Sequence, residues 1–263
     1  MDARERRARI EERVVRNGEV LFAQLATEFD VSEMTIRRDI ETLQQAGVVR
    51  RISGGAIALT GTAFEPSYGL RAGTAVESKM HIAERIADLL RPGETVALDG
   101  GSTVGAVARA IRGRGLSLTV VTPSILVAST LADDEGTIII LTGGRLRSGE
   151  MSLVGTDAEA TFARYNCDTF VIGVAGVDAE HGLTEYHPQE ASVKRAAIAA
   201  SSRLIVGVDS TKLGRVHLVN IAPLTRVSAL VTDAADADLT VRAAAAAGAD
   251  TILVPPPVRA TDV

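Results

Sequence analysis

The chain has one cysteine, no apolar run long enough to cross a membrane, and no excess of positive charge. Cys167 cannot form an internal disulfide, which fits a reducing cytoplasm, and its apolar surroundings predict a small buried side chain rather than a nucleophile. No stretch approaches the roughly 20 apolar residues of a membrane helix. Residues 1–16 are charged throughout and lack the apolar core of a signal peptide. We therefore expect a cytoplasmic protein that does not associate with membranes.

The missing positive charge limits how the protein can bind nucleic acid. The formal net charge is −5, with 28 Lys and Arg against 33 Asp and Glu. This balance excludes a surface that attracts DNA in bulk, so any contact with DNA has to be local. The 46% apolar content and 23% charged content over 263 residues are typical of a well-packed protein with one large domain or two unequal ones.

Residues 1–58 have the pattern of three short helices followed by a hairpin. The first helix ends at Gly18, and the third begins after Ser32 as its N-cap and runs from Glu33 to about Ala46. The stretch "VVRRISGGAIAL" alternates as a two-stranded wing, with Gly54–Gly55 at the turn. This pattern predicts a winged helix-turn-helix. Periodicity fades over residues 59–76, which predicts a linker.

The third predicted helix carries two adjacent arginines in its first turns. At about 100° per residue, Ile36, Ile40 and Leu43 share a core face, and the arginines lie outside it. An ordinary solvated helix face explains that pattern, but it does not explain the arginine pair in the wing. We therefore predict that this helix enters the major groove of double-stranded operator DNA. The predicted DNA-binding residues are Ser32, Met34, Thr35, Arg37, Arg38, Arg50 and Arg51.

From residue 77 to residue 255, helical stretches alternate with short runs rich in β-branched residues. Strands buried on both faces need that composition, so the region predicts a doubly wound, mostly parallel α/β domain. Residues 256–263 begin with proline and predict a loose tail. The expected strands are 95–99, 118–122, 137–141, 169–174, 204–209, 228–232 and 251–254. The expected helices are 77–90, 102–112, 123–131, 155–164, 189–201 and 236–247.

The α/β region lacks both common nucleotide-binding motifs. It has no G-x-G-x-x-G after a strand and no G-x-x-x-x-G-K-[ST], so neither a dinucleotide nor a nucleoside triphosphate is favoured. Instead, "LDGGSTVGAVARAI" places a Gly-Gly turn, Ser102 and Thr103 at the start of a helix, where amides and hydroxyls suit a phosphate. A routine strand–helix turn explains this segment equally well. Polar residues at four other strand ends favour an anionic-ligand pocket.

The segment "LATEFDVSEMTIRRDIETLQQAGVVRRISGGA" closely resembles the DNA-binding signature of the DeoR family of bacterial transcriptional regulators. Residues 64–233 also resemble that family, through "LDGGSTV", "LTGGRLR" and "VDSTKLG". The resemblance implies a sensor domain related to ribose-5-phosphate isomerase that binds a phosphorylated sugar or polyol, with no catalytic residues, metal or other cofactor. Together with the strand ends, the predicted effector-binding residues are Lys79, Asp99, Gly100, Gly101, Ser102, Thr103, Thr122, Gly143, Gly144, Arg145, Asp178, Glu190, Lys194 and Lys212.

Three features leave the identity of the ligand open. The family's usual "DaGTT" is "DGGST" here, and the usual "TN" after the second strand is Thr122–Pro123. His181 and His187 are isolated loop residues that we expect at the surface. Glu190 and Lys194, taken alone, have the i, i+4 spacing of an ordinary helix ion pair.

We therefore predict a transcriptional repressor of carbohydrate-metabolism genes that responds to a sugar phosphate. A neutral winged helix binds DNA weakly, so we expect a homodimer or homotetramer whose avidity compensates. One alternative is a sugar-phosphate isomerase with a DNA-binding domain, using Glu190, Asp178 and Lys194. Another is a non-catalytic interaction module with a vestigial pocket.

Overall fold

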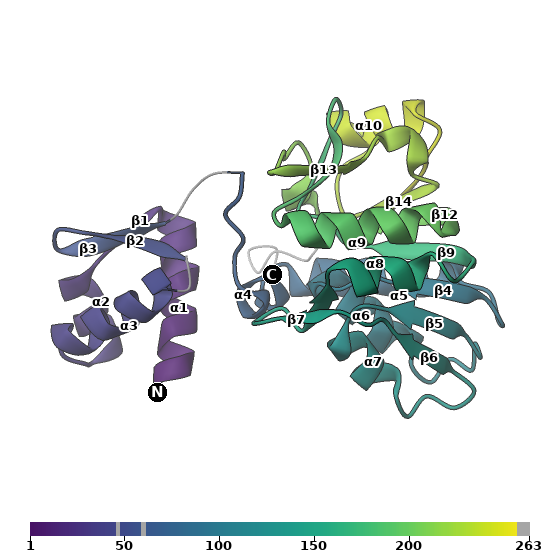
Figure 1. Cartoon of the computed structure of the whole chain (residues 1–263). Coiled ribbons are helices and arrows are strands. Elements are labelled where there is room, and N and C mark those ends of the chain that lie inside the picture. The colour runs from purple at the N-terminus through teal and green to yellow at the C-terminus, as the bar shows by residue number, and fades with distance from the viewer. Residues whose placement is uncertain (46–47, 59–61, 257–263) are drawn as a thin grey trace. The chain divides into compact units, whose positions relative to one another are not determined.

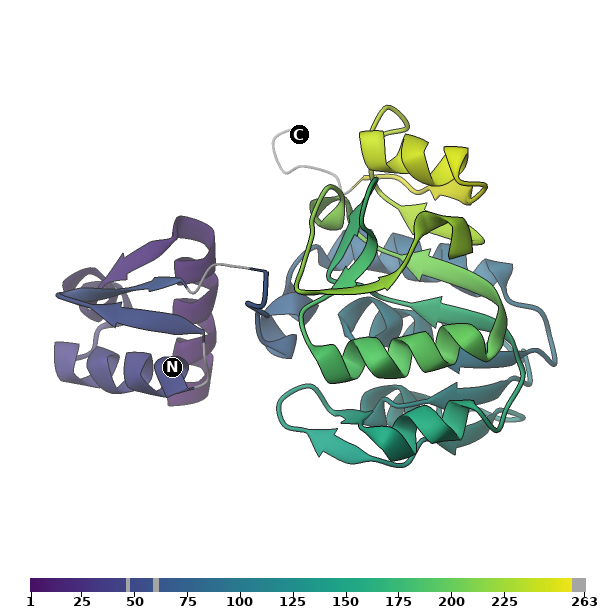
Figure 2. The same ribbon diagram turned by 45° about the horizontal axis from the view of Figure 1, so that its top comes forward.

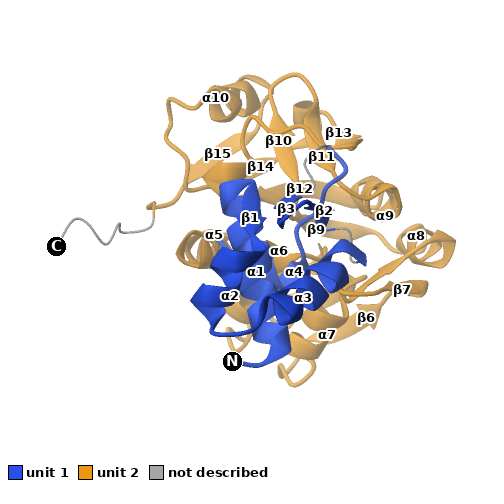
Figure 3. Ribbon diagram, turned by 90° about the vertical axis from the view of Figure 1, so that its left-hand side faces the viewer, with its two compact units in different colours: residues 1–74 blue, residues 75–263 orange. Residues whose placement is uncertain are grey.

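The computed structural model describes residues 1–45, 48–58 and 62–256 (Figure 1). The chain divides into two compact units, Met1–Thr74 and Ala75–Val263 (Figure 3). Nearly all of the tail predicted at 256–263, and the predicted end of the third helix at residues 46–47, lie outside the described residues. In the described ranges, no helix has the length and apolar character to cross a membrane.

The first unit contains a winged helix-turn-helix, as predicted. Its apolar core joins all three helices and the sheet, with Ile10, Leu25 and Ile36 among the buried side chains. The wing has a third strand, because the segment after Gly18 pairs with the second strand of the predicted hairpin. The elements are α1 (Ala3–Asn17), β1 (Glu19–Leu21), α2 (Phe22–Phe29), α3 (Glu33–Gln45), β2 (Val49–Ile52) and β3 (Gly55–Ala58), with strand order β1-β3-β2.

The wing turn is formed by Ser53 and Gly54, one residue earlier than the predicted Gly54–Gly55. Ile52 pairs with Gly55, which leaves two residues between the strands, and Gly54 has a φ of 78° that glycine readily adopts. Gly55 serves a different purpose, since a Cβ there would stand 2.2 Å from the carbonyl oxygen of Val20. Glycine therefore permits the close pairing of β1 with β3.

A buried ion pair fixes the third helix to the first. Arg6 Nε donates to Asp39 Oδ2 at 2.6 Å, and the two residues are 7% and 3% exposed. Arg7 adds a longer contact of 3.4 Å to the same carboxylate. Removing one partner of a buried pair leaves an uncompensated charge and costs about 3–5 kcal/mol. The pair therefore fixes the orientation of α3, which carries the predicted DNA-binding arginines.

The segment predicted as a linker, 59–76, contains the helix α4 (Tyr68–Gly73) and the beginning of α5. Ser67 caps α4, because its Oγ accepts a hydrogen bond from the Leu70 amide at 3.3 Å. The amide and hydroxyl of Ser67 also donate to the buried carboxylate of Glu11 in α1, at 2.9 and 2.8 Å. The weak periodicity of this segment predicted no helix, but the structure has a capped helix there whose cap is hydrogen-bonded to α1.

The second unit is built on a seven-stranded parallel sheet, so the predicted doubly wound α/β fold is confirmed (Figure 1). Its strand order is β15-β14-β12-β9-β4-β5-β6. Every strand expected from the sequence is present. The strands are β4 (Thr95–Leu98), β5 (Thr119–Thr122), β6 (Ile138–Leu141), β9 (Cys167–Ile172), β12 (Ser201–Gly207), β14 (Ala229–Thr232) and β15 (Asp250–Leu253).

Helices cover both faces of this sheet (Figure 2). Val96 of β4 packs in a cluster with Ile82 and Val107, whereas the neighbouring Ala97 belongs to the cluster of Phe162 on the other face. Cys167 is buried in that second cluster, and burial raises the pKa of its thiol. Helices α5 (Val76–Leu89), α6 (Ser102–Ile111) and α7 (Ile125–Leu131) line one face, and α8 (Thr156–Phe162), α9 (Pro188–Ala199) and α10 (Leu239–Ala246) the other.

The sheet reverses its direction of growth between β4 and β9. From β4 the chain proceeds through β5 to β6 at one edge, and then returns to the other side of β4 to form β9. Loops after two such strands leave in opposite directions, which creates the crevice where open α/β sheets bind ligands. The candidate site is therefore expected beside Asp99 and Gly173, the residues that follow these two strands.

Several short elements were not predicted. An antiparallel hairpin and a small antiparallel sheet lie in segments that the sequence analysis left as loops. They are β7 (Arg145–Arg147) paired with β8 (Ser152–Val154), and β10 (Gly176–Asp178), β11 (Gly182–Glu185) and β13 (Val219–Ala222). Two 3-10 turns, η1 (Ser210–Lys212) and η2 (Leu224–Arg226), complete the unit.

Candidate functional site

Lys194 of α9 lies at the reversal point of the sheet and is buried among acceptors. Its Nζ donates to Asp99 Oδ2 at 2.7 Å and to the Gly173 carbonyl oxygen at 2.6 Å, and it forms an ion pair with Glu185 Oε2 at 2.8 Å. Two of the three ammonium hydrogens are therefore used in hydrogen bonds, and the Glu185 carboxylate lies next to the same group. One side chain thereby joins the ends of β4, β9 and β11.

The charges around Lys194 shift one another's protonation. Burial raises the pKa of Asp99 to about 6, although the Lys194 ammonium opposes that shift. Burial alone would lower the pKa of Lys194, but Asp99, Glu185 and Glu190 outweigh it and raise that pKa. Lys194 is consequently protonated at every physiological pH, and its role is to hold carboxylates in place.

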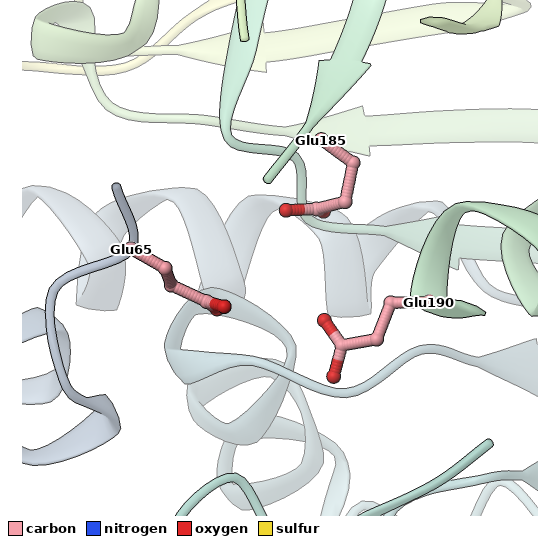
Figure 4. Close-up of side chains that lie close together, drawn as sticks. All are labelled: Glu65, Glu185 and Glu190. Carbon is pink, nitrogen blue, oxygen red and sulfur yellow. The ribbon is translucent and has the colours of Figure 1, made fainter. Parts of the chain in front are cut away.

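Glu190, on the first turn of α9, belongs to the same group of charges. Its Oε1 accepts from Ser152 Oγ at 2.7 Å and lies 3.1 Å from Arg147 Nη1. Burial would raise the pKa of Glu190, but Lys194 and Arg147 hold it below its usual value. Figure 4 shows Glu185 at the end of β11 and Glu190 on α9, with both carboxylates reaching toward the same side, and carboxylate oxygens of the two lie within 4.8 Å of each other.

We call Asp99, Arg147, Ser152, Glu185, Glu190 and Lys194 the Lys194 cluster. Its three carboxylates exceed its two cations, so it carries an excess of acceptors. Such a group suits hydroxyl groups, which donate hydrogen bonds to carboxylates, better than it suits a phosphate. An anionic part of a ligand would need a separate contact.

The turn between β4 and α6 lies beside this cluster and has backbone donors at the start of a helix. Gly101 precedes the helix with a φ of 90°, a conformation that favours glycine, and no side chain of the described residues caps the α6 N-terminus. The first amides of a helix have no partner within it and point along the positive end of the helix dipole. Gly100 lies beside the cluster, since a Cβ there would be 3.6 Å from Cβ of Ser152.

Other residues predicted to bind the effector have structural roles. Thr122 is fully buried, and its hydroxyl accepts from the Ser124 amide at 3.1 Å. The carboxylate of Asp178 accepts from the amides of Glu180 and His181 and lies 3.0 Å from the His181 ring, so it forms the β10–β11 turn. These contacts give Thr122 and Asp178 a part in local structure, and their role in effector binding stays a prediction.

The remaining predicted residues are the two glycines after β6, Arg145 of β7, Lys79 of α5 and Lys212 of η1. Gly144 has a φ of 114° and packs where a Cβ would be 2.7 Å from the Val154 carbonyl oxygen, and Gly143 precedes it. Arg145 donates to Gln189 at 2.6 Å. Lys79 is buried in the first turn of α5, and Lys212 is half-buried at the end of η1.

The histidines only partly match the prediction. His181 is exposed, as expected for a loop residue, and it pairs with Asp178 at 3.0 Å. His187 is half-buried and precedes the first turn of α9.

The sequence analysis missed Glu185, Arg147 and Ser152. Glu185 stands in a strand of the small antiparallel sheet, and the other two stand in the β7–β8 hairpin. The available signal was the set of glycines in "LTGGRLRSGEMSLVG", where Gly144 and Gly149 mark turns on the two sides of the short strand "RLR".

The predicted DNA-binding residues lie at the start of α3 and in β2 of unit 1, and all of them are exposed or partly exposed. Ser32 caps α3, since its Oγ accepts from the Thr35 amide at 3.2 Å. Met34 is 69% exposed, an unusual position for an apolar side chain unless it meets a partner. Arg38 and Arg50 are exposed, and neither side chain forms a hydrogen bond or ion pair within the described part of the chain. Their donors remain available for phosphates or base edges.

The other two arginines of this set form ion pairs with nearby glutamates. Arg37 Nη2 lies 3.4 Å from Glu33 Oε2, and Arg51 Nη1 lies 3.1 Å from Glu41 Oε1. All four side chains are at least 39% exposed, so each pair contributes about 0–1 kcal/mol. Phosphate groups can therefore replace these carboxylates at little cost.

Comparison with known proteins identifies both units. A family model described as the DeoR C terminal sensor domain matches residues 74–234, and one described as the DeoR-like helix-turn-helix domain matches residues 6–62. The chain belongs to the DeoR family. The prediction of a DNA-binding transcriptional regulator with a sensor domain is thereby confirmed.

Relatives of the chain in this family are named repressors. The glycerol-3-phosphate regulon repressor of Escherichia coli (strain K12) is 34% identical over 223 residues, which cover 85% of this chain and 88% of that protein. The transcriptional repressor GlcR of Bacillus subtilis (strain 168) is 34% identical, covering 82% of this chain and 83% of its own. A putative aga operon transcriptional repressor of Escherichia coli O157:H7 is 32% identical, and the match covers 87% of this chain and 86% of that protein.

A solved structure of ribose 5-phosphate isomerase A from Methanocaldococcus jannaschii is similar to part of this chain. The TM-score is 0.41 at 15% identity, and the match covers 53% of this chain and 55% of that one. The chain thus spans about half the length of that structure.

The raised pKa of Asp99 predicts a pH-dependent stability. Between about pH 4 and about pH 6 the folded chain keeps a proton that the unfolded chain has lost, so this carboxylate's contribution to stability falls as the pH rises through that window. The melting temperature of Asp99→Asn should therefore rise relative to that of the wild type as the pH increases from about 4 to about 6.

Asp178→Asn is the matched control for this titration. Backbone and side-chain hydrogen bonds from His181 lower the pKa of Asp178, so its contribution changes only below about pH 4. Its melting curve should parallel the wild type between about pH 4 and about pH 6. An Asp99→Asn curve that is equally parallel would contradict the assignment of a raised pKa.

Proposed function

We propose that the chain is a repressor of carbohydrate-metabolism genes whose operator binding is controlled by a phosphorylated sugar or polyol. The observation that carries this proposal is the position of the Lys194 cluster beside the uncapped N-terminus of α6, at the reversal point of the sheet. The names of the relatives support it, since they refer to glycerol-3-phosphate and to repressors. A protein of this kind would act in the cytoplasm.

The two halves of the site suit the two halves of such a ligand. A phosphate would bind at the amides of Gly101, Ser102 and Thr103, where the helix dipole favours negative charge. The polyol hydroxyls would donate to Asp99 and Glu190, which the cations of the cluster hold in place. Lys194 would hold these carboxylates rather than contact the phosphate, because its ammonium group already lies among Asp99, Glu185 and the Gly173 carbonyl oxygen.

Unit 1 would bind the operator through α3 and the wing. The exposed Arg38 and Arg50 would contact phosphates or guanine edges, and Met34 would contact an apolar base edge such as the methyl group of thymine. Because unit 1 has as many acidic as basic residues over positions 1–60, one copy would bind weakly. A homodimer or homotetramer on repeated half-sites would supply the missing affinity.

Control by the effector requires that the ligand bind one arrangement of the protein better than another. Unit 1 ends with α4, whose cap Ser67 is bonded to the buried Glu11 of α1. A displacement of α4 would therefore move α1 through these hydrogen bonds, and α1 would move α3 through the Arg6–Asp39 ion pair. We propose this series of contacts as the route from the sensor to the DNA-binding surface.

An isomerase activity is the weaker alternative. Enediol chemistry needs a carboxylate base next to a group that polarises a carbonyl. Lys194 is already bound to Asp99 and the Gly173 carbonyl oxygen and paired with Glu185, and Asp178 is engaged in a turn. We therefore propose that the protein binds a sugar phosphate without converting it.

A thermal-shift titration with a panel of sugar and polyol phosphates tests the effector site. A true ligand should raise the melting temperature, since saturation at 100 times the dissociation constant stabilises the fold by about 2.7 kcal/mol. Ser102→Asp should abolish this shift without destabilising the free protein, because a carboxylate in the first turn of α6 repels phosphate but suits the helix dipole.

Thr156→Asp is the matched control, since it adds the same charge at the α8 N-terminus, which also lacks a side-chain cap. It should leave the ligand-induced shift unchanged. Stabilisation by the same sugar phosphate in Ser102→Asp would show that the phosphate binds elsewhere, and turnover of any panel member would contradict the non-enzymatic proposal.

A second experiment tests the DNA surface. Arg38→Ala should weaken binding to a duplex from the region upstream of the protein's own gene by about 1–3 kcal/mol, measured by fluorescence anisotropy. Arg9→Ala removes the same charge from an exposed position on α1 and should have little effect. Unchanged DNA binding by a variant lacking both Arg37 and Arg38 would refute the assignment of α3.

A further inference from the structure

Phe22, the first residue of α2, is a buried ring that contacts two arginines of the predicted DNA surface. The ring is 1% exposed, yet Cζ of Arg37 lies 5.0 Å from its centroid and Cζ of Arg51 lies 5.8 Å from it. Both distances are within the range of a cation–π contact. Arg37 belongs to α3 and Arg51 to β2, so one side chain bridges the recognition helix and the wing.

The backbone of Phe22 reinforces this bridge. Its amide donates to the Gly54 carbonyl oxygen in the wing turn at 2.9 Å. The beginning of α2 is therefore attached to the wing by a hydrogen bond and to the wing arginine by the ring. Any apolar side chain of similar size would fill the core here, but only an aromatic ring offers the negative face that attracts two cations.

Stacking on a ring differs from pairing with a carboxylate in what it leaves free. A guanidinium group that lies on an aromatic face keeps the N–H donors in its plane available for phosphate or guanine. Glu33 and Glu41 instead occupy donors of Arg37 and Arg51. DNA has to displace these carboxylates, whereas the contact with the ring can persist in the complex.

We propose that Phe22 is a positioning residue for DNA recognition, which holds Arg37 and Arg51 at a fixed separation before DNA arrives. Ordering a long side chain at an interface costs free energy, so two arginines already held on one ring bind more tightly than two free ones. The inference rests on the proposed role of these arginines at the DNA surface.

Phe22→Leu in the full chain tests the proposal, because it keeps an apolar side chain and removes the ring. Binding to the duplex from upstream of the protein's own gene should weaken about fivefold or more, the loss expected when two long side chains have to be ordered on binding. Phe22→Tyr should restore binding, and Phe22→Met replaces the leucine variant if that variant does not fold. Leu25→Ala is the control, since it removes a buried side chain from the same core and should leave the affinity unchanged while the unit is folded.

A double-mutant cycle separates positioning from general stability. In a chain that carries both Arg37→Ala and Arg51→Ala, Phe22→Leu should cause no further loss of DNA affinity, measured at low salt where weak binding is detectable. An undiminished loss in that background, or wild-type affinity for Phe22→Leu alone, would overturn the proposal. If the two arginine substitutions by themselves leave binding unchanged, the proposed DNA surface fails as well, and the two failures are distinguished.

Discussion

The ammonium group of Lys194, buried beneath the reversal point of the sheet, is the interaction on which the candidate sensor site depends. It donates hydrogen bonds to Asp99 and to the Gly173 carbonyl and forms an ion pair with Glu185, so it joins α9 to two strands of the parallel sheet and to the small antiparallel sheet. Burial of so many charges is unfavourable unless each has a partner. The cluster therefore gives the site a fixed arrangement of acceptors.

Much of the fold follows from local composition. Strands buried on both faces have to be runs of apolar and β-branched residues, so segments such as "TVAL" and "TVVT" were recognisable without long-range information. The β7–β8 hairpin and the sheet of β10, β11 and β13 were not, because their strands are three or four residues long. Their pairing is set by contacts with α9 and with one another rather than by periodicity.

The site was predictable only where it adjoins the parallel strands. Asp99 and the glycines after β4 stand at a strand end, and Lys194 was found as half of a helix pair with Glu190. The structure instead pairs Lys194 with Asp99 and Glu185, and Glu190 with Arg147. Glu185 and Arg147 stand in the short strands β11 and β7, which bring them to the cluster from distant segments of the chain. The same reason explains Phe22, whose relation to Arg37 and Arg51 depends on how the wing folds back on α2.

The central claim is that occupancy of the sensor site changes how tightly unit 1 binds DNA. The most direct test is the DNA affinity of the full chain with and without a saturating amount of the sugar phosphate that gives the largest thermal shift. The account predicts a change of about 5- to 150-fold, with an equal reciprocal change in ligand affinity when DNA is bound. Identical DNA affinity in the free and the fully ligand-saturated protein would contradict it.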